Sequence, residues 1–150
     1  MTLKVTFDIL AAMKDTFQRK RIYEAVLEEH LRDNRQMAFL TGPRQCGKTT
    51  LAKTLADRYF TWDDLATRQL VAGDAAGLAN AAGLGIASDR KTIITLDEIH
   101  KFVRWKSFLK GFFDLYEDRM RLIVTGSARL DIYKRGSDSL MGRYFLYHMH

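Results

Sequence analysis

The sequence predicts an α/β fold, in which short buried strands alternate with segments of helical length. Apolar runs of strand length recur along the chain, and amphipathic stretches with a period of three to four residues separate several of them. Only one proline, Pro43, interrupts the pattern, and no internal repeat is present. Strands that are separated by helices favour a parallel sheet with crossover helices.

The first half of the chain contains four predicted elements. An amphipathic pattern predicts a helix over Phe17–Arg32, and the apolar run Met37–Thr41 predicts a buried strand. Helical spacing returns over Lys48–Arg58. The segment Tyr59–Trp62 is typical of a second short strand.

The second half continues the alternation. A helix is predicted over Asp64–Val71, whereas the Ala- and Gly-rich stretch Ala72–Ala87 is compatible with a helix or a loop. The remaining predicted elements are a strand at Thr92–Leu96, a helix at Trp105–Tyr116, a strand at Arg121–Thr125 and a last strand at Tyr144–Tyr147. Within the predicted helix Trp105–Tyr116, the residues Trp105, Phe108, Phe112 and Tyr116 recur at helical spacing, so we expect them in the core.

Length and composition indicate one folded domain. The chain has 150 residues, of which 47% are hydrophobic and 28% charged, enough to bury a core. The single cysteine, Cys46, cannot form an internal disulfide, and no secretory signal pattern follows Met1, so we expect a cytoplasmic protein. No apolar run approaches the roughly 18 residues of a spanning helix, which excludes membrane insertion.

The charge is basic and unevenly distributed. The formal net charge is +6, and residues 101–150 carry 10 basic and 5 acidic side chains. A basic surface favours phosphate-bearing partners, so contact of this last third with nucleic acid is one hypothesis. The alternative is a charge that serves only solubility.

The most informative segment is Gly42–Thr50, with the sequence GPRQCGKTT, which matches the phosphate-loop pattern GxxxxGK(S/T). It follows a predicted strand and opens a predicted helix, so its backbone N–H groups can converge on a phosphate chain. Lys48 would neutralise the β and γ phosphates, and the Thr49 hydroxyl would bind Mg²⁺. The candidate nucleotide-binding residues are Gly42, Pro43, Arg44, Gln45, Cys46, Gly47, Lys48, Thr49 and Thr50.

Two further strand ends carry polar residues. After the apolar run that begins at Ile93, Asp97 is a candidate Mg²⁺ ligand and Glu98 a candidate base for the attacking water. The strand Arg121–Thr125 ends in Thr125, a candidate sensor of the γ phosphate, with Ser127 as the second choice. A strand followed by an ordinary polar turn is the alternative.

Three weaker signals have simpler interpretations. Cys46 lies where a thiolate is favoured, so redox control is one hypothesis and a small apolar filler is the other. Asp97 to His100 spell a helicase-like DExH sequence, but 150 residues cannot supply a second motor domain. The stretch Gly83–Ser88 falls one residue short of a dinucleotide fingerprint, so we discard it.

These motifs resemble those of a family, the prokaryotic AAA-type ATP-binding proteins. The shared segments include GPRQCGKTTLAKTLADRYF, TLDEIHKFVRWKSFLKGFFDLYED and LIVTGSARLDIYKRG, which with shorter matches cover most of the chain outside the Ala- and Gly-rich stretch. The resemblance implies a P-loop NTPase three-layer sandwich whose five-stranded parallel sheet has an AAA- or RecA-like strand order. It also implies that the metal strand is flanked by the loop strand and the sensor strand.

The resemblance assigns roles to residues as well. It implies ATP and Mg²⁺ as ligands, Glu98, Lys48 and Thr125 as catalytic residues, and Thr49 and Asp97 as metal ligands. Arg143 and Arg129 are candidates for an arginine that reaches nucleotide in the same chain or in a neighbouring subunit of a homo-oligomer. By this likeness, Arg21 to Tyr23 are candidates to lie near the adenine.

The resemblance also suggests a domain organisation. We expect an N-terminal helical segment over residues 1–35 and a nucleotide-binding core over residues 36–150. Family members usually continue into a C-terminal domain, so the resemblance implies that this chain is a fragment or a shortened version.

The function that follows is binding of Mg-ATP with slow or assembly-dependent hydrolysis. The alternative is a nucleotide-dependent switch with little turnover that controls a DNA-binding or effector module. A small-molecule kinase is a third reading, for which the sequence contains only the shared loop.

Overall fold

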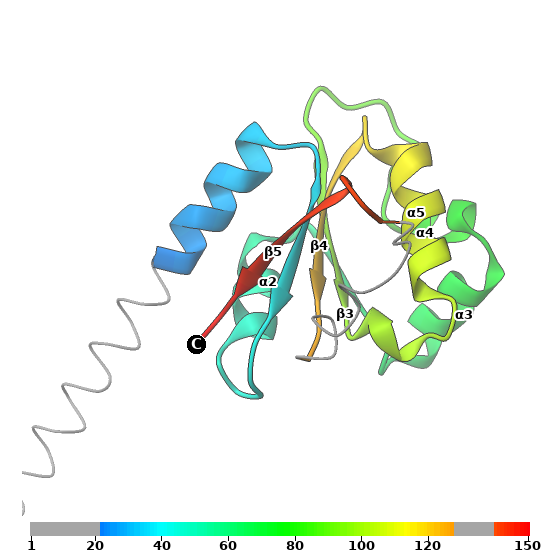
Figure 1. Cartoon of the computed structure of the whole chain (residues 1–150). Coiled ribbons are helices and arrows are strands. Elements are labelled where there is room, and N and C mark those ends of the chain that lie inside the picture. The colour runs from blue at the N-terminus through cyan, green and yellow to red at the C-terminus, as the bar shows by residue number, and fades with distance from the viewer. Residues whose placement is uncertain (1–21, 128–139) are drawn as a thin grey trace, which may run out of the picture.

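The computed structural model describes residues 22–127 and 140–150, which form a five-stranded sheet between two layers of helices (Figure 1). The strands are β1 (Met37–Thr41), β2 (Arg58–Thr61), β3 (Thr92–Asp97), β4 (Met120–Thr125) and β5 (Tyr144–His148). The helices are a segment at 22–33, α2 (Lys48–Leu55), α3 (Leu65–Gly73), α4 (Ala75–Ala81), the short 3-10 helix η1 (Ile99–Lys101) and α5 (Trp105–Tyr116). The predicted α/β class and parallel sheet are confirmed.

The sheet order is β2-β3-β4-β1-β5, and every neighbouring pair is parallel. This order corrects one expectation, because the loop strand β1 does not border the metal strand β3. Strand β4 lies between them, with Thr125 in register with both Leu40 and Asp97. A crossover helix is long enough to carry the chain past a neighbouring position, so chain order does not fix sheet order.

The two faces of the sheet bury two separate cores. Met37 and Phe39 of β1 pack on the side of α3, α4 and α5, whereas Ala38 and Leu40 pack on the side of α2 and the helix at 22–33. This division follows from the alternation of side chains along a strand, and it makes the central strands apolar on both faces. The aromatic stripe of α5 contributes to the first core, as predicted.

In the described residues, two elements end more than one residue away from the sequence prediction. The undecided stretch after Val71 is partly helical: α3 continues to Gly73, and α4 begins after Asp74, whose carboxylate accepts a hydrogen bond from the Gly77 N–H. Such a side-chain cap satisfies a backbone donor that the first helical turn leaves free. The helix α2 ends at Leu55, earlier than expected, because the backbone of Ala56 is extended ahead of β2.

The helix at 22–33 is fastened to the sheet through His30, which is 2% exposed. Its Nε2–H donates to the Gln36 carbonyl at 2.8 Å, so Nδ1 accepts from the Tyr147 hydroxyl at 2.9 Å. Arg121 of β4 donates from Nε to the Leu31 carbonyl at 2.8 Å. Burial lowers the pKa of His30, with a smaller contribution from the nearby Arg121 charge, against the hydrogen bond to Gln36.

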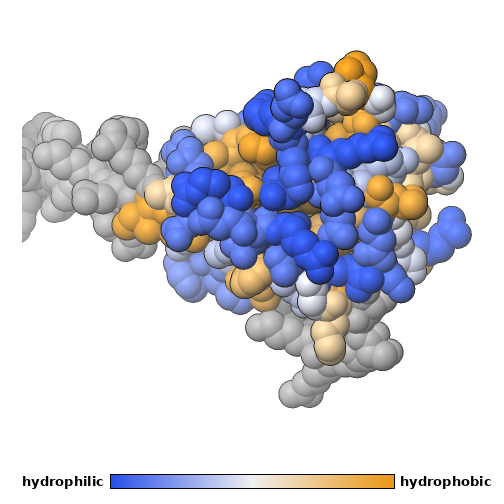
Figure 2. All heavy atoms as spheres, turned by 90° about the horizontal axis from the view of Figure 1, so that it is seen from above, coloured by the Kyte–Doolittle hydropathy of each residue, from blue (hydrophilic) through white to orange (hydrophobic). Residues whose placement is uncertain are grey.

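The surface away from these cores is mixed. In the view from above, hydrophilic residues cover most of the molecule, and hydrophobic residues form small separate groups among them (Figure 2). The most exposed of the large apolar side chains are Val103, Ile86 and Met141. Scattered apolar side chains of this kind are normal on a folded domain.

The lowered pKa of His30 predicts a dependence of stability on pH. We expect the free energy of unfolding to fall as the pH drops below about 6.5, because the unfolded chain then takes up a proton that folded His30 resists. Urea titrations between about pH 7.5 and 5.5 measure this slope. The variant His30→Gln should show a smaller slope, and equal slopes in the two proteins would contradict the assignment.

Substitution by alanine should have opposite effects on stability at two glycines. Gly111 lies in the interior of α5 with open space where a Cβ would be, so Gly111→Ala should stabilise by up to about 1 kcal/mol. Thermal unfolding should then shift upward by about 2 to 4 °C. Gly42 has φ +148°, and a Cβ there would clash with the Met149 carbonyl oxygen, so Gly42→Ala should lower the midpoint of thermal unfolding. Equal shifts of the unfolding midpoint in the two variants would contradict the open space at Gly111 and the close approach at Gly42.

Candidate functional site

The carboxyl ends of β1, β3 and β4 meet at one edge of the sheet. The register pairs Leu40 with Thr125 and Thr125 with Asp97, so the loop after β1 and the acids after β3 lie on either side of Thr125. In open parallel sheets, ligands bind beyond this edge. The structure therefore brings the three motifs singled out in the sequence to one place.

The loop between β1 and α2 has an unusual backbone. Positive φ angles occur at Gly42 (148°), Gln45 (63°) and Gly47 (94°), the last being the N-cap of α2. A non-glycine residue in this region costs about 1 kcal/mol or more, and such strain collects at binding sites. Left-handed residues within a turn can direct several N–H groups toward one anion, next to the positive end of a helix.

The Lys48 side chain folds back onto the backbone of this loop. Its ammonium group donates to the carbonyl oxygens of Gly42 at 2.9 Å and Pro43 at 2.6 Å, and lies 3.6 Å from the Cys46 sulfur. The residue is 9% exposed, so the charge is largely shielded from water. A buried cation beside a turn of backbone N–H groups is a suitable site for phosphate.

Asp97, which is 7% exposed, contacts three hydroxyl groups at the site. Its Oδ1 accepts a hydrogen bond from the Thr125 hydroxyl. Its Oδ2 accepts from the Tyr59 hydroxyl at 2.5 Å and lies 3.5 Å from the Thr49 hydroxyl. Three hydroxyl groups from three elements therefore surround one buried carboxylate.

Tyr59 was missed by the sequence analysis, which treated it only as part of a strand. It pairs with Thr95 across β2 and β3, two positions before Asp97, so the two side chains lie on the same face as diagonal neighbours. Burial raises the pKa of Tyr59, and the hydrogen bond to Asp97 raises it further, so the phenol keeps its proton. Only strand pairing brings these residues together, and no local pattern indicates it.

Glu98 follows β3 directly, and its side chain has different surroundings from that of Asp97. Its backbone is left-handed, with φ 59° and ψ 21°, and its N–H donates to the Thr125 carbonyl at 3.0 Å. The side chain is 27% exposed, and its Oε2 lies 3.4 Å from Lys101 Nζ and 3.7 Å from His100 Nε2. The two adjacent acids therefore occupy different surroundings: Asp97 is buried among hydroxyl groups, and Glu98 lies near solvent, Lys101 and the His100 ring.

Other predicted residues lie further from this centre. The Ser127 hydroxyl is 3.5 Å from His100 Nε2, the nitrogen that lies 3.7 Å from Glu98 Oε2. Arg143 precedes β5, at the end of the sheet opposite the carboxyl ends of the strands. There it makes two hydrogen bonds to Asp114, at 2.7 and 2.9 Å. It therefore does not reach the loop of its own chain. Arg129 and Arg21 lie outside the described residues.

The donor set at Asp97 suits a small hard cation. Mg²⁺ prefers oxygen ligands and usually combines one or two protein groups with phosphate oxygens and water. Thr49 and Asp97 supply a hydroxyl and a carboxylate oxygen next to the loop. In residues 22–127 and 140–150, no cluster of three or more His, Cys, Asp or Glu side chains could hold a metal without other ligands. The residues present fit Mg²⁺ that arrives with phosphates.

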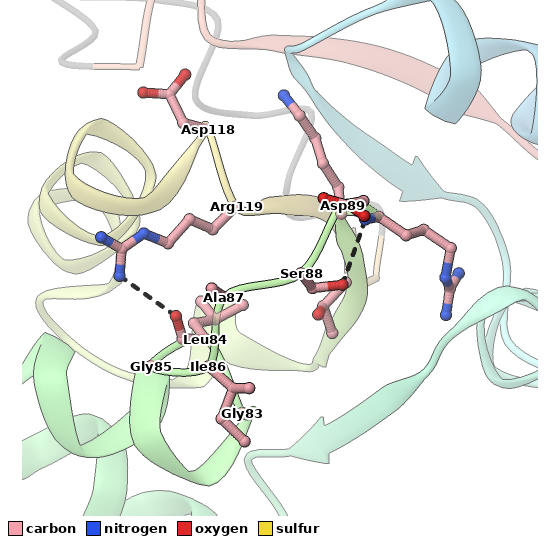
Figure 3. A pocket seen from close by; sticks show the side chains of 12 residues that line it. Gly83, Leu84, Gly85, Ile86, Ala87, Ser88, Asp89, Asp118 and Arg119 are labelled. Atoms are coloured by element: carbon pink, nitrogen blue, oxygen red, sulfur yellow. Dashed lines mark hydrogen bonds between the residues drawn. The ribbon is translucent and has the colours of Figure 1, made fainter.

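A pocket of about 340 Å³ lies elsewhere, between the loop at residues 83–92 and the turn at Asp118 and Arg119 (Figure 3). The Arg119 guanidinium donates to the Leu84 carbonyl at 3.3 Å, and the Arg90 N–H donates to the Ser88 hydroxyl at 3.2 Å. Its lining includes the discarded Gly83–Ser88 stretch, which joins a helix to a strand. A dinucleotide-binding loop has a strand before it and a helix after it. The Gly83–Ser88 stretch has the reverse order, so it is not such a loop.

Comparisons with known proteins agree with the fold and the loop. A family model described as AAA domain matches residues 34–150. Seventy chains of known structure match, among them a structure of C. elegans PCH-2, with a TM-score of 0.55 and 16% sequence identity. That match covers 93% of this chain and 42% of the PCH-2 chain, so this chain spans less than half of that protein's length.

The comparison with curated proteins found no match. Within the described residues, none of the helices has the length and apolar character needed to cross a membrane.

The family model covers residues 34–150, most of the chain. Within that range the Gly42–Thr50 loop, the buried Asp97 carboxylate and Thr125 lie at the same end of the sheet. The P-loop NTPase sandwich expected from the sequence is the observed fold. The chain belongs to the AAA domain family.

Proposed function

We propose that this AAA domain binds ATP with Mg²⁺ and hydrolyses it, slowly or only when assembled. The observation that carries the proposal is the position of Asp97, which lies within 3.5 Å of the Thr49 hydroxyl at the start of α2. A nucleotide loop and a metal-binding carboxylate must face each other for phosphate chemistry, and the short distance between Thr49 and Asp97 supports these roles. The AAA domain match supports nucleotide binding in general.

Each residue of the site has a role in this proposal. The backbone of Gly42–Thr50 and the Lys48 ammonium bind the phosphates, and Thr49 and Asp97 hold the metal. When bound, Mg²⁺ neutralises the charge that develops on the β and γ phosphate oxygens. Glu98 accepts a proton from the water that attacks the γ phosphorus, as the bond from this phosphorus to the β–γ bridging oxygen breaks and ADP leaves.

Thr125 has a double function in the proposal. Its hydroxyl proton is donated to Asp97, which fixes the carboxylate. A γ phosphate at the end of β4 would compete with Asp97 for this proton, so Thr125 would respond to the presence of the phosphate. This response is the sensor role proposed for it.

The expected partners remain proposals. Because Arg143 lies at the end of the sheet away from the loop, Arg129 or an arginine of a neighbouring subunit is the proposed arginine that completes the site. Contact of residues 101–150 with nucleic acid and a cytoplasmic location also stay predictions. The alternative function, a nucleotide-dependent switch with little turnover, uses the same site without rapid hydrolysis.

Removal of the loop cation tests the site itself. We expect Lys48→Ala to weaken ATP binding by about tenfold or more, because a charge-assisted contact to phosphate is lost. Titration with a fluorescent ATP analogue, with and without Mg²⁺, measures the effect. Lys110→Ala, on the exposed side of α5, is the matched control and should bind ATP like the wild type. Equal affinity in Lys48→Ala and the wild type would show that the nucleotide binds elsewhere.

Substitution of the proposed base distinguishes an enzyme from a switch. In Glu98→Gln, release of phosphate should fall by about 100-fold or more while ATP affinity is retained, because only the proton acceptor is lost. Glu117→Gln, at the end of α5, is the control. If wild-type protein binds ATP but releases no more phosphate than Glu98→Gln, the switch is the better description.

A further inference from the structure

We propose that Tyr59 is a positioning residue of the metal site, whose hydroxyl group holds the Asp97 oxygen nearest Thr49. Through this contact it would set the affinity of the site for the Mg²⁺ that accompanies ATP. The inference rests on the function proposed above and adds a residue that the loop and acid motifs do not contain.

The two oxygens of Asp97 have separate partners. Oδ1 is bound by the Thr125 hydroxyl, on the side of β4. Oδ2 is bound by the Tyr59 hydroxyl at 2.5 Å and is the oxygen that lies 3.5 Å from Thr49 Oγ1. Tyr59 therefore contacts the oxygen on the side where a cation shared with Thr49 must lie. A carboxylate held at both oxygens cannot rotate about its terminal torsion, which is otherwise soft.

The position of Tyr59 is itself well defined. Strand β2 pairs with β3 so that Thr61 faces Asp97 and Tyr59 faces Thr95. The ring is half-buried, and the Lys53 ammonium of α2 lies 4.5 Å from its centroid. The ring thus lies on the face of the sheet that α2, the helix carrying Thr49, covers, and its hydroxyl reaches Asp97.

Partners of this kind have measurable effects. Groups that hydrogen-bond to a metal-binding carboxylate orient it, and their removal typically weakens metal affinity or activity by about 10- to 100-fold. A residue that serves only packing would instead lower stability and would affect nucleotide binding with and without the metal alike. This difference separates the two roles.

The test is Tyr59→Phe, which keeps the ring and removes the hydroxyl. We expect the Mg²⁺ concentration that half-maximally strengthens binding of a fluorescent ATP analogue to rise about tenfold. Affinity for the analogue without Mg²⁺ should stay within about twofold of the wild type. Tyr147→Phe is the matched control, because it removes a half-buried hydroxyl that binds His30 away from the site.

A second measurement needs no nucleotide. In a double-mutant cycle on the free energy of unfolding, Tyr59→Phe and Asp97→Ala should be strongly non-additive, since each removes the same hydrogen bond. Strict additivity would overturn the proposal, as would an unchanged Mg²⁺ requirement in Tyr59→Phe or an equal change in Tyr147→Phe. If Mg²⁺ does not strengthen ATP binding in the wild type, the proposed function fails, and the inference fails with it.

Discussion

The candidate site depends on one buried carboxylate and the hydroxyl groups that satisfy it. Removing a carboxylate from water is costly unless hydrogen bonds replace its hydration. Asp97 is almost fully buried and meets Thr125 from β4, Tyr59 from β2 and Thr49 from α2. Because these groups come from different parts of the chain, the site forms only when the whole sheet edge is assembled.

The position of β4 makes this arrangement possible. It lies between β1, which leads into the Gly42–Thr50 loop, and β3, which ends at Asp97, so Thr125 is in register with the ends of both. The Thr125 carbonyl accepts a hydrogen bond from the Glu98 N–H. The N–H of the next residue, Gly126, donates to the Leu40 carbonyl at 3.2 Å. The end of β4 therefore fixes the backbone at the acids and at the start of the loop together.

The last strand closes the other side of the loop. Strand β5 pairs with β1, and the Met149 N–H donates to the Thr41 carbonyl at 2.8 Å just before the loop begins. The Met149 carbonyl occupies the space that a side chain at Gly42 would need. Tyr147 of the same strand donates to His30, so the helix at 22–33 and the loop are both fastened to β5.

The sequence by itself determined the α/β class, the order of the elements and the residues of the loop, because hydrophobic period and the glycine and lysine spacing are local properties. It also identified Asp97, Glu98 and Thr125, since polar residues at the ends of apolar strands form a local pattern. Strand order, the separate directions of Asp97 and Glu98, and the distance of Arg143 from the loop were decided only in the tertiary structure. The same holds for Tyr59, which lies 38 residues from Asp97 in the chain. Pairing between distant strands brings them together, and a single sequence carries no local signal of which strands will pair.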